Sequence, residues 1–142
     1  MKKVLPCLWG LFFCFLACSP IPYNSIYGYE IEYQSIGRSS SEYIGIKEGL
    51  VRYAQKENDT LTHILNKRDY KALYHLLNKV NLDSLGELTV SSKKHQFDGA
   101  LLTTLMIKDT QLITHKSPAF DHDNPPGEIK DLIAYLRKIG KQ

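Results

Sequence analysis

The chain has 142 residues, with 18 Lys+Arg against 15 Asp+Glu and a formal net charge of +3. This length fits one domain that can bury an adequate core without covalent staples. The nearly balanced charge gives no reason to expect a nucleic-acid partner.

The N-terminal segment 1–18 has the anatomy of a bacterial export signal. Two lysines follow the initiator Met, and an almost wholly apolar stretch occupies 4–17. The sequence FLAC at 15–18 resembles a bacterial lipobox, with Phe where Leu is most common. The resemblance implies that 1–17 is a lipoprotein signal peptide and that Cys18 becomes the lipidated N-terminus. The alternatives are an ordinary cleaved signal peptide and an uncleaved transmembrane helix, although the apolar stretch is shorter than the roughly 20 residues that span a bilayer.

The lipoprotein prediction extends to the residues directly after the signal. Residues 18–26 are expected to form the lipidated Cys and a short tether, in which Pro20 and Pro22 favour an extended backbone. By the same resemblance, a Ser directly after the Cys implies a location at the outer membrane. No acidic run of the kind that some bacteria use for surface export follows Cys18, so the domain is expected to face the periplasm. Cys7 and Cys14 leave with the signal, so the mature chain holds no free thiol for a Cys-ligated metal or a Cys nucleophile.

The first half of the domain is predicted to be a run of antiparallel strands. Residues 27–33 alternate in polarity, which is typical of a half-buried strand. Further strands are predicted at 42–47, 50–55 and 60–65, joined by turns at 37–41, 47–49 and 58–59. Three hairpin-like links in succession favour an antiparallel meander.

Helical periodicity begins after the fourth predicted strand. Asn66 is the expected N-cap, and apolar residues recur three or four apart from Tyr70 to Val80. A short irregular or 3₁₀ segment is predicted at 82–88, followed by a polar loop at 89–95.

The most apolar run of the mature chain lies at 100–107, and its length suits a central strand. A turn at 108–110 leads into a second strand at 111–115, and 117–124 is predicted as a loop.

The last element is predicted to be a helix. Asn124 is expected to cap it, with the two following prolines in its first turn. An apolar stripe runs from Ile129 to Ile139, and Gly140 is expected to close the helix.

The order ββββ-α-ββ-α predicts an α+β fold: one antiparallel sheet with two amphipathic helices packed on one face, in a single domain spanning 27–140. The chain resembles a group of small uncharacterised bacterial lipoproteins. The resemblance is carried by the sequence DGA at 98–100 and the sequence FDHDNPP at 120–126. It implies a fold, and no established activity comes with it.

The same two patches hold the candidate ligand or partner contacts, which are Asp98, Asp121, His122 and Asp123. Carboxylate and imidazole groups bind metals and move protons, and a hairpin of 100–107 with 111–115 is expected to bring His115 near Asp98. The alternative is structural, because Asp and Asn next to Gly or Pro are ordinary turn and capping residues. No metal-binding spacing such as His-Glu-x-x-His occurs, so we predict no catalytic residue, metal ligand or cofactor.

Tyrosines concentrate near the start of the domain, where five of the nine lie within 23–43. Their period-two placement favours packing on the core. The alternative is an exposed aromatic binding face, if helices cover only one side of the sheet.

These observations predict a lipid-anchored envelope protein that acts as a non-enzymatic binding or assembly module. Its expected partners are the membrane, through the lipid anchor, and an envelope protein. One alternative is an immunity or inhibitor lipoprotein. The other is a metal-dependent or hydrolytic enzyme that uses Asp98, His115, Asp121 and His122.

Overall fold

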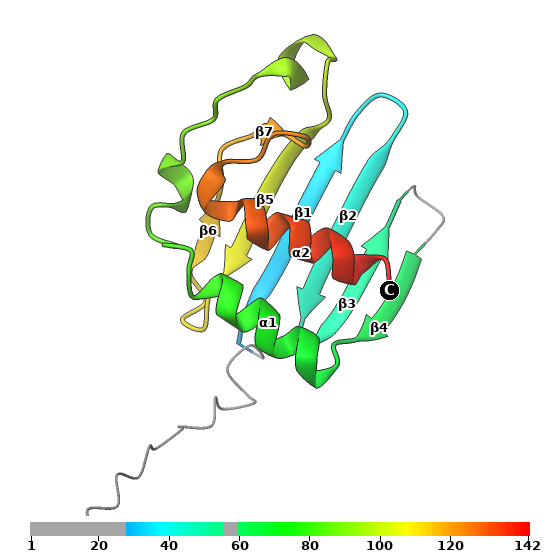
Figure 1. Cartoon of the computed structure of the whole chain (residues 1–142), viewed down its shortest axis with the longest axis vertical. Coiled ribbons are helices and arrows are strands. Elements are labelled where there is room, and N and C mark those ends of the chain that lie inside the picture. Colours follow the sequence, from blue (N-terminus) through cyan, green and yellow to red (C-terminus); the bar gives the residue numbers. More distant parts are fainter. Residues whose placement is uncertain (1–27, 56–59) are drawn as a thin grey trace, which may run out of the picture.

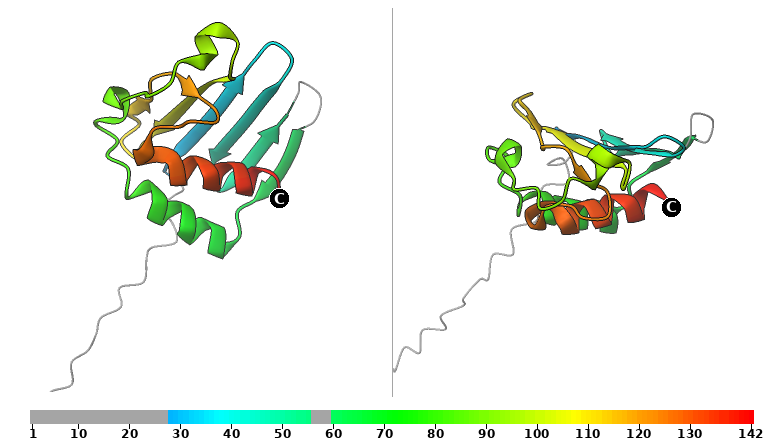
Figure 2. Two further views of the ribbon diagram at one scale, coloured as in Figure 1. Left: turned by 45° about the horizontal axis from the view of Figure 1, so that its top comes forward. Right: turned by 90° about the horizontal axis from the view of Figure 1, so that it is seen from above.

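The computed structural model describes residues 28–55 and 60–142, which form one antiparallel sheet with two α-helices (Figure 1). The seven strands in this part of the chain are β1 Glu30–Ile36, β2 Ser41–Lys47, β3 Leu50–Ala54, β4 Thr60–Ile64, β5 Leu102–Lys108, β6 Thr114–Lys116 and β7 Phe120–Asp121. The helices are α1 Lys67–Leu77 and α2 Lys130–Gly140, and both lie on the same side of the sheet (Figure 2, right panel). The predicted α+β class is confirmed. The predicted signal peptide, Cys18 and the tether lie outside the described residues.

The strand order is β4-β3-β2-β1-β5-β6, with β7 also paired to β5. Strand β1 sits in the middle because it pairs with β2 through a hairpin and with β5 from the second half of the chain. In this register Tyr33 lies opposite both Ile44 and Leu105. The prediction of a central strand near 100–107 is confirmed, since β5 has β1 on one side and β6 and β7 on the other.

The core lies between the helices and the face of the sheet that they cover. On β1, Ile31 and Tyr33 are at most 1% exposed, and their neighbours Glu30 and Glu32 point to the opposite face, as period two requires. The helices contribute the buried residues Tyr70, Leu73, Leu77, Leu132, Ile133, Leu136 and Ile139. Each fully buried large apolar side chain contributes roughly 1.5–3 kcal/mol, so this layer is the main source of stability.

Helix α1 begins as predicted. The Asn66 side chain accepts hydrogen bonds from the N–H groups of Arg68 and Asp69, both at 2.9 Å, and so caps the first turn. Asp69 is buried and accepts a 2.7 Å hydrogen bond from the Tyr135 hydroxyl of α2. Burial and this contact with Asp69 raise the pKa of Tyr135 to about 12. The first turn of α1 is therefore hydrogen-bonded to α2 through Asp69.

Helix α2 begins later than predicted, and Asn124 is not its cap. The Asn124 side chain instead donates to Ser91 Oγ at 3.0 Å. Pro126 is extended, with φ −50° and ψ 141°, and a single 3₁₀ turn at Gly127–Ile129 precedes α2. The two prolines hold the backbone extended, so helical geometry starts only after them. Gly140 is the last residue of α2 rather than a residue beyond it.

Several strand boundaries also differ from the predictions. Strand β1 continues to Ile36 because its hairpin register pairs that residue with Ser41 across the turn. Strand β6 starts only at Thr114, since the Asp109 carboxylate accepts the N–H groups of Gln111 and Ile113 and holds these residues in a turn.

The prediction of a continuous loop at 117–124 is wrong, because Phe120 and Asp121 form β7 against β5 and are fully buried. The predicted 3₁₀ character of 82–88 is confirmed at Leu85–Glu87. A second 3₁₀ turn, Lys94–Phe97, begins inside the predicted loop at 89–95.

The opposite face of the sheet carries no helix within the described residues (Figure 2, right panel). We call it the open face. Over β1, β2 and β3 it includes Glu30, Glu32, Gln34, Tyr43, Gly45, Lys47, Leu50 and Arg52.

Candidate functional site

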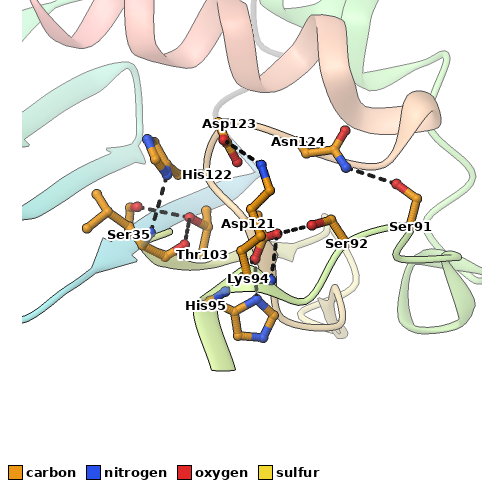
Figure 3. A network of polar contacts seen from close by, with 11 residues as sticks. Ser35, Ser91, Ser92, Lys94, His95, Thr103, Asp121, His122, Asp123 and Asn124 are labelled. Atoms are coloured by element: carbon orange, nitrogen blue, oxygen red, sulfur yellow. Dashed lines mark hydrogen bonds and ion pairs between the residues drawn. The ribbon is translucent and has the colours of Figure 1, made fainter. Parts of the chain in front are cut away.

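Asp121 is fully buried and accepts hydrogen bonds at both carboxylate oxygens (Figure 3). Oδ2 accepts from the Ser92 hydroxyl and from the Lys94 N–H at 2.9 Å. Oδ1 accepts from the His95 N–H at 2.8 Å and lies 2.6 Å from His95 Nδ1. Burial alone would raise the pKa of Asp121, but the hydrogen bonds from Ser92, His95 and Lys94 outweigh it and hold that pKa well below its usual range. The buried carboxylate therefore links β7 to the segment 92–95 through hydrogen bonds.

Asp98 and His122 line one hollow of about 230 Å³, together with residues 37–40 and 99–101. The Leu101 N–H donates to His122 Nδ1 at 3.3 Å, so a neutral His122 ring carries its proton on Nε2. The hollow thus joins the two sequence patches at 98–100 and 120–126. Asp98 forms a 2.5 Å ion pair with Arg38, but these side chains are 57% and 83% exposed, and such pairs contribute only about 0–1 kcal/mol.

Asp123 directly follows His122 and lies on the surface. Its carboxylate is 3.4 Å from Lys94 Nζ, and both side chains are about half exposed. The four predicted contact residues therefore occupy three environments. Asp98 and His122 share the small hollow, Asp121 is buried with its oxygens occupied, and Asp123 faces solvent.

The predicted approach of His115 to Asp98 is wrong. His115 pairs with Ile107 near the end of β5, whereas Asp98 precedes the start of that strand. His115 Nε2 instead lies 3.1 Å from Asp109 Oδ2. The hydrogen bond with His115, assisted by the N–H donors of the turn, holds the pKa of Asp109 below its usual value. Within residues 28–55 and 60–142, no group of three His, Cys, Asp or Glu side chains is placed to hold a metal ion.

Most described tyrosines near the start of the domain pack on the core. Tyr33 and Tyr53 are buried at 0% and 5% exposure, and Tyr29 is half-buried against the same cluster. Tyr43 faces the other way and lies on the open face. Of the three described tyrosines within 23–43, only Tyr43 therefore lies on the open face, and it is partly buried there. Tyr23 and Tyr27 lie outside the described residues.

A hollow on the open face is lined by Gly45 and by residues around it on three strands. It has a volume of about 570 Å³. Its lining comes from β1, β2 and β3: Glu30, Ile31, Glu32, Tyr43, Gly45, Ile46, Lys47, Glu48, Leu50 and Arg52. Gly45 lies directly between Glu32 on β1 and Arg52 on β3 in the strand register. We call this site the Gly45 hollow.

Some charged residues that line the Gly45 hollow make ion pairs within the chain, and others do not. Glu30 pairs with Lys47 at 2.9 Å and lies 3.9 Å from Lys108, and the hydrogen bond with Lys47 lowers the pKa of Glu30. Glu32 and Arg52 differ, because neither makes an ion pair with any other described residue. Their charges are available to a bound group.

Sequence reasoning missed this site. A glycine inside a strand often marks a place where a ligand or another backbone segment approaches closely. Gly45, between Ile44 and Ile46, is such a glycine. The pairing of Gly45 with Glu32 and Arg52 has no sequence signal, because it depends on the register of three strands.

No helix in the described part of the chain is long and apolar enough to cross a bilayer. No protein-family model, curated protein or solved structure was found to match this chain.

Proposed function

We propose that this chain is a lipid-anchored envelope protein whose domain is a non-enzymatic binding or assembly module. The anchor rests on the FLAC sequence at 15–18. The observation that carries the binding role is the Gly45 hollow on the open face, where Glu32 and Arg52 have no ion-pair partner among the described residues.

The Gly45 hollow favours binding better than the predicted Asp and His cluster does. The oxygens of Asp121 are already occupied by donors of the same chain, so a ligand would have to displace them at a large desolvation cost. Glu32 and Arg52 stand on an uncovered face and need no such displacement.

The binding role is tested by site-specific photocrosslinking of the anchored protein in intact cells. A photoreactive residue at Gln34, which is exposed and opposite Tyr43, is expected to give discrete adducts. The same residue at Ala134, exposed on α2, is the matched control and is expected to give none. The adducts from position 34 should disappear when Arg52→Gln is added. Equal adducts from both positions, or adducts that ignore Arg52→Gln, would contradict the proposal.

The anchor is tested by replacing single cysteines. With a clickable fatty-acid analogue, the wild-type protein is expected to incorporate label and to fractionate with membranes. Cys18→Ser should abolish both, because the thioether needs that sulfur. Cys14→Ser lies within the predicted signal peptide and should keep both, so labelling that follows Cys14 would overturn the anchor assignment.

A further inference from the structure

We propose that the Gly45 hollow binds a small zwitterion, either a free α-amino acid or a short peptide with free termini; this rests on the proposed binding function and names its ligand class. The ammonium group of the ligand is held by Glu32 and its carboxylate by Arg52, with Tyr43 between them.

The spacing of the two charges carries the first step. Glu32, Gly45 and Arg52 form one cross-strand row, so the backbones of β1 and β3 stand apart by two strand spacings, roughly 10 Å. Glycine adds no side chain at the centre of this row. Glu32 and Arg52 therefore flank a middle position that holds only the Tyr43 ring above Gly45, and a ligand bearing both charges can span them over this ring.

Tyr43 supplies a donor at that middle position. A methyl group built on Gly45 would lie only 2.5 Å from the Tyr43 hydroxyl and 3.0 Å from two ring atoms, so the ring lies over the glycine. Burial, and then the negative charge of Glu32, raise the pKa of Tyr43, while Arg52 opposes them. The phenol is therefore protonated at neutral pH and can donate a hydrogen bond to a carboxylate beside Arg52.

The rest of the Gly45 hollow selects against ligands of a single charge. Glu30, Glu32 and Glu48 line it together with Lys47 and Arg52, so it presents no strong field of one sign to a polyanion or a polycation. Leu50 and the Tyr43 ring supply apolar surface for a ligand side chain. The volume of about 570 Å³ falls within the range of roughly 300–1,000 Å³ for small-molecule sites.

The test is ligand-observed saturation-transfer NMR on the protein extracted from membranes in detergent, with four probes. L-Leucine and L-leucyl-L-leucine carry both charges, N-acetyl-L-leucine lacks the ammonium, and L-leucinamide lacks the carboxylate. We expect saturable binding of one or both zwitterions, with a dissociation constant of roughly 1 mM for a ligand of this size. The two singly charged probes should bind about tenfold more weakly or worse, since each loses a charge-assisted contact. Binding of leucine indicates a free amino acid, and binding of the dipeptide alone indicates a peptide.

Variants connect the binding to the site. Glu32→Gln and Arg52→Gln should each weaken zwitterion binding about tenfold, and Tyr43→Leu should weaken it without filling the hollow. Glu128→Gln and Lys130→Gln are exposed on the helical side and serve as matched controls without effect. Equal binding of all four probes, or no saturable binding of any, would overturn the inference. If zwitterion binding is absent while the crosslinks from Gln34 persist, only this inference fails; if both are absent, the proposed function fails as well.

Discussion

Asp121→Asn is expected to lower the melting temperature of the domain by about 10 °C, because it breaks a buried hydrogen-bond network. The carboxylate accepts from Ser92, Lys94 and His95 at both oxygens. An Asn side chain presents an N–H₂ group to one half of these donors and leaves them unsatisfied. Thermal unfolding of the soluble chain that starts at Ser19, followed by circular dichroism, measures the difference.

The same network predicts an acid dependence. The folded pKa of Asp121 is held below its unfolded value of about 4. The stabilisation it contributes is therefore complete above the unfolded pKa and is lost as the pH falls below about 4 towards the folded pKa. Asp121→Asn lacks this contribution at every pH. Urea unfolding at neutral and acidic pH should show the gap between wild type and variant narrowing in acid, and a constant gap would contradict the ionic network.

Two neighbouring carboxylates are matched controls for this prediction. Asp98→Asn removes an exposed ion pair with Arg38, and Asn tolerates the left-handed φ of 59° at that position. Asp123→Asn removes an exposed contact with Lys94. Each should change the melting temperature by no more than about 2 °C. A large loss at either control and none at Asp121 would reverse the structural assignment.

Phe120→Ala is expected to cost about 4 kcal/mol of unfolding free energy. Phe120 lies in β7, pairs with Thr103 of β5 and is 0% exposed. Truncation leaves a cavity where the buried ring of this two-residue strand packs in the core. Equilibrium denaturation in urea gives the free energy directly.

Phe97→Ala is the matched control, because the same side chain is 83% exposed there. Its expected effect is within about 0.5 kcal/mol. Equal losses at the two positions would mean that the Phe97 ring packs against the domain in solution instead of facing solvent. A small loss of unfolding free energy in Phe120→Ala would contradict the buried strand β7 and favour the loop predicted from the sequence at 117–124.

Local signals in the sequence were sufficient for the regular elements. Alternation placed β1 to β3, and a helical stripe behind Asn66 placed α1 with its cap, because periodicity and capping depend on residues within a few positions. Predictions from local sequence failed where long-range contacts determine the backbone conformation. Asn is a common helix cap, yet the Asn124 side chain hydrogen-bonds to Ser91 instead. The two prolines after it keep the backbone extended, so α2 starts further along the chain.

The candidate site shows the same division. Residue types and their order were enough to predict the α+β order of the chain, which is confirmed, and to select a set of polar candidate residues. The export signal with a lipobox-like cysteine stays a prediction. Three-dimensional packing was needed to show that Asp121 is buried under segment 92–95, that His115 is far along β5 from Asp98, and that Gly45 separates Glu32 from Arg52. The physical reason is that side chains on different strands meet through sheet register and edge packing, which depend on the whole set of pairings and not on any local stretch.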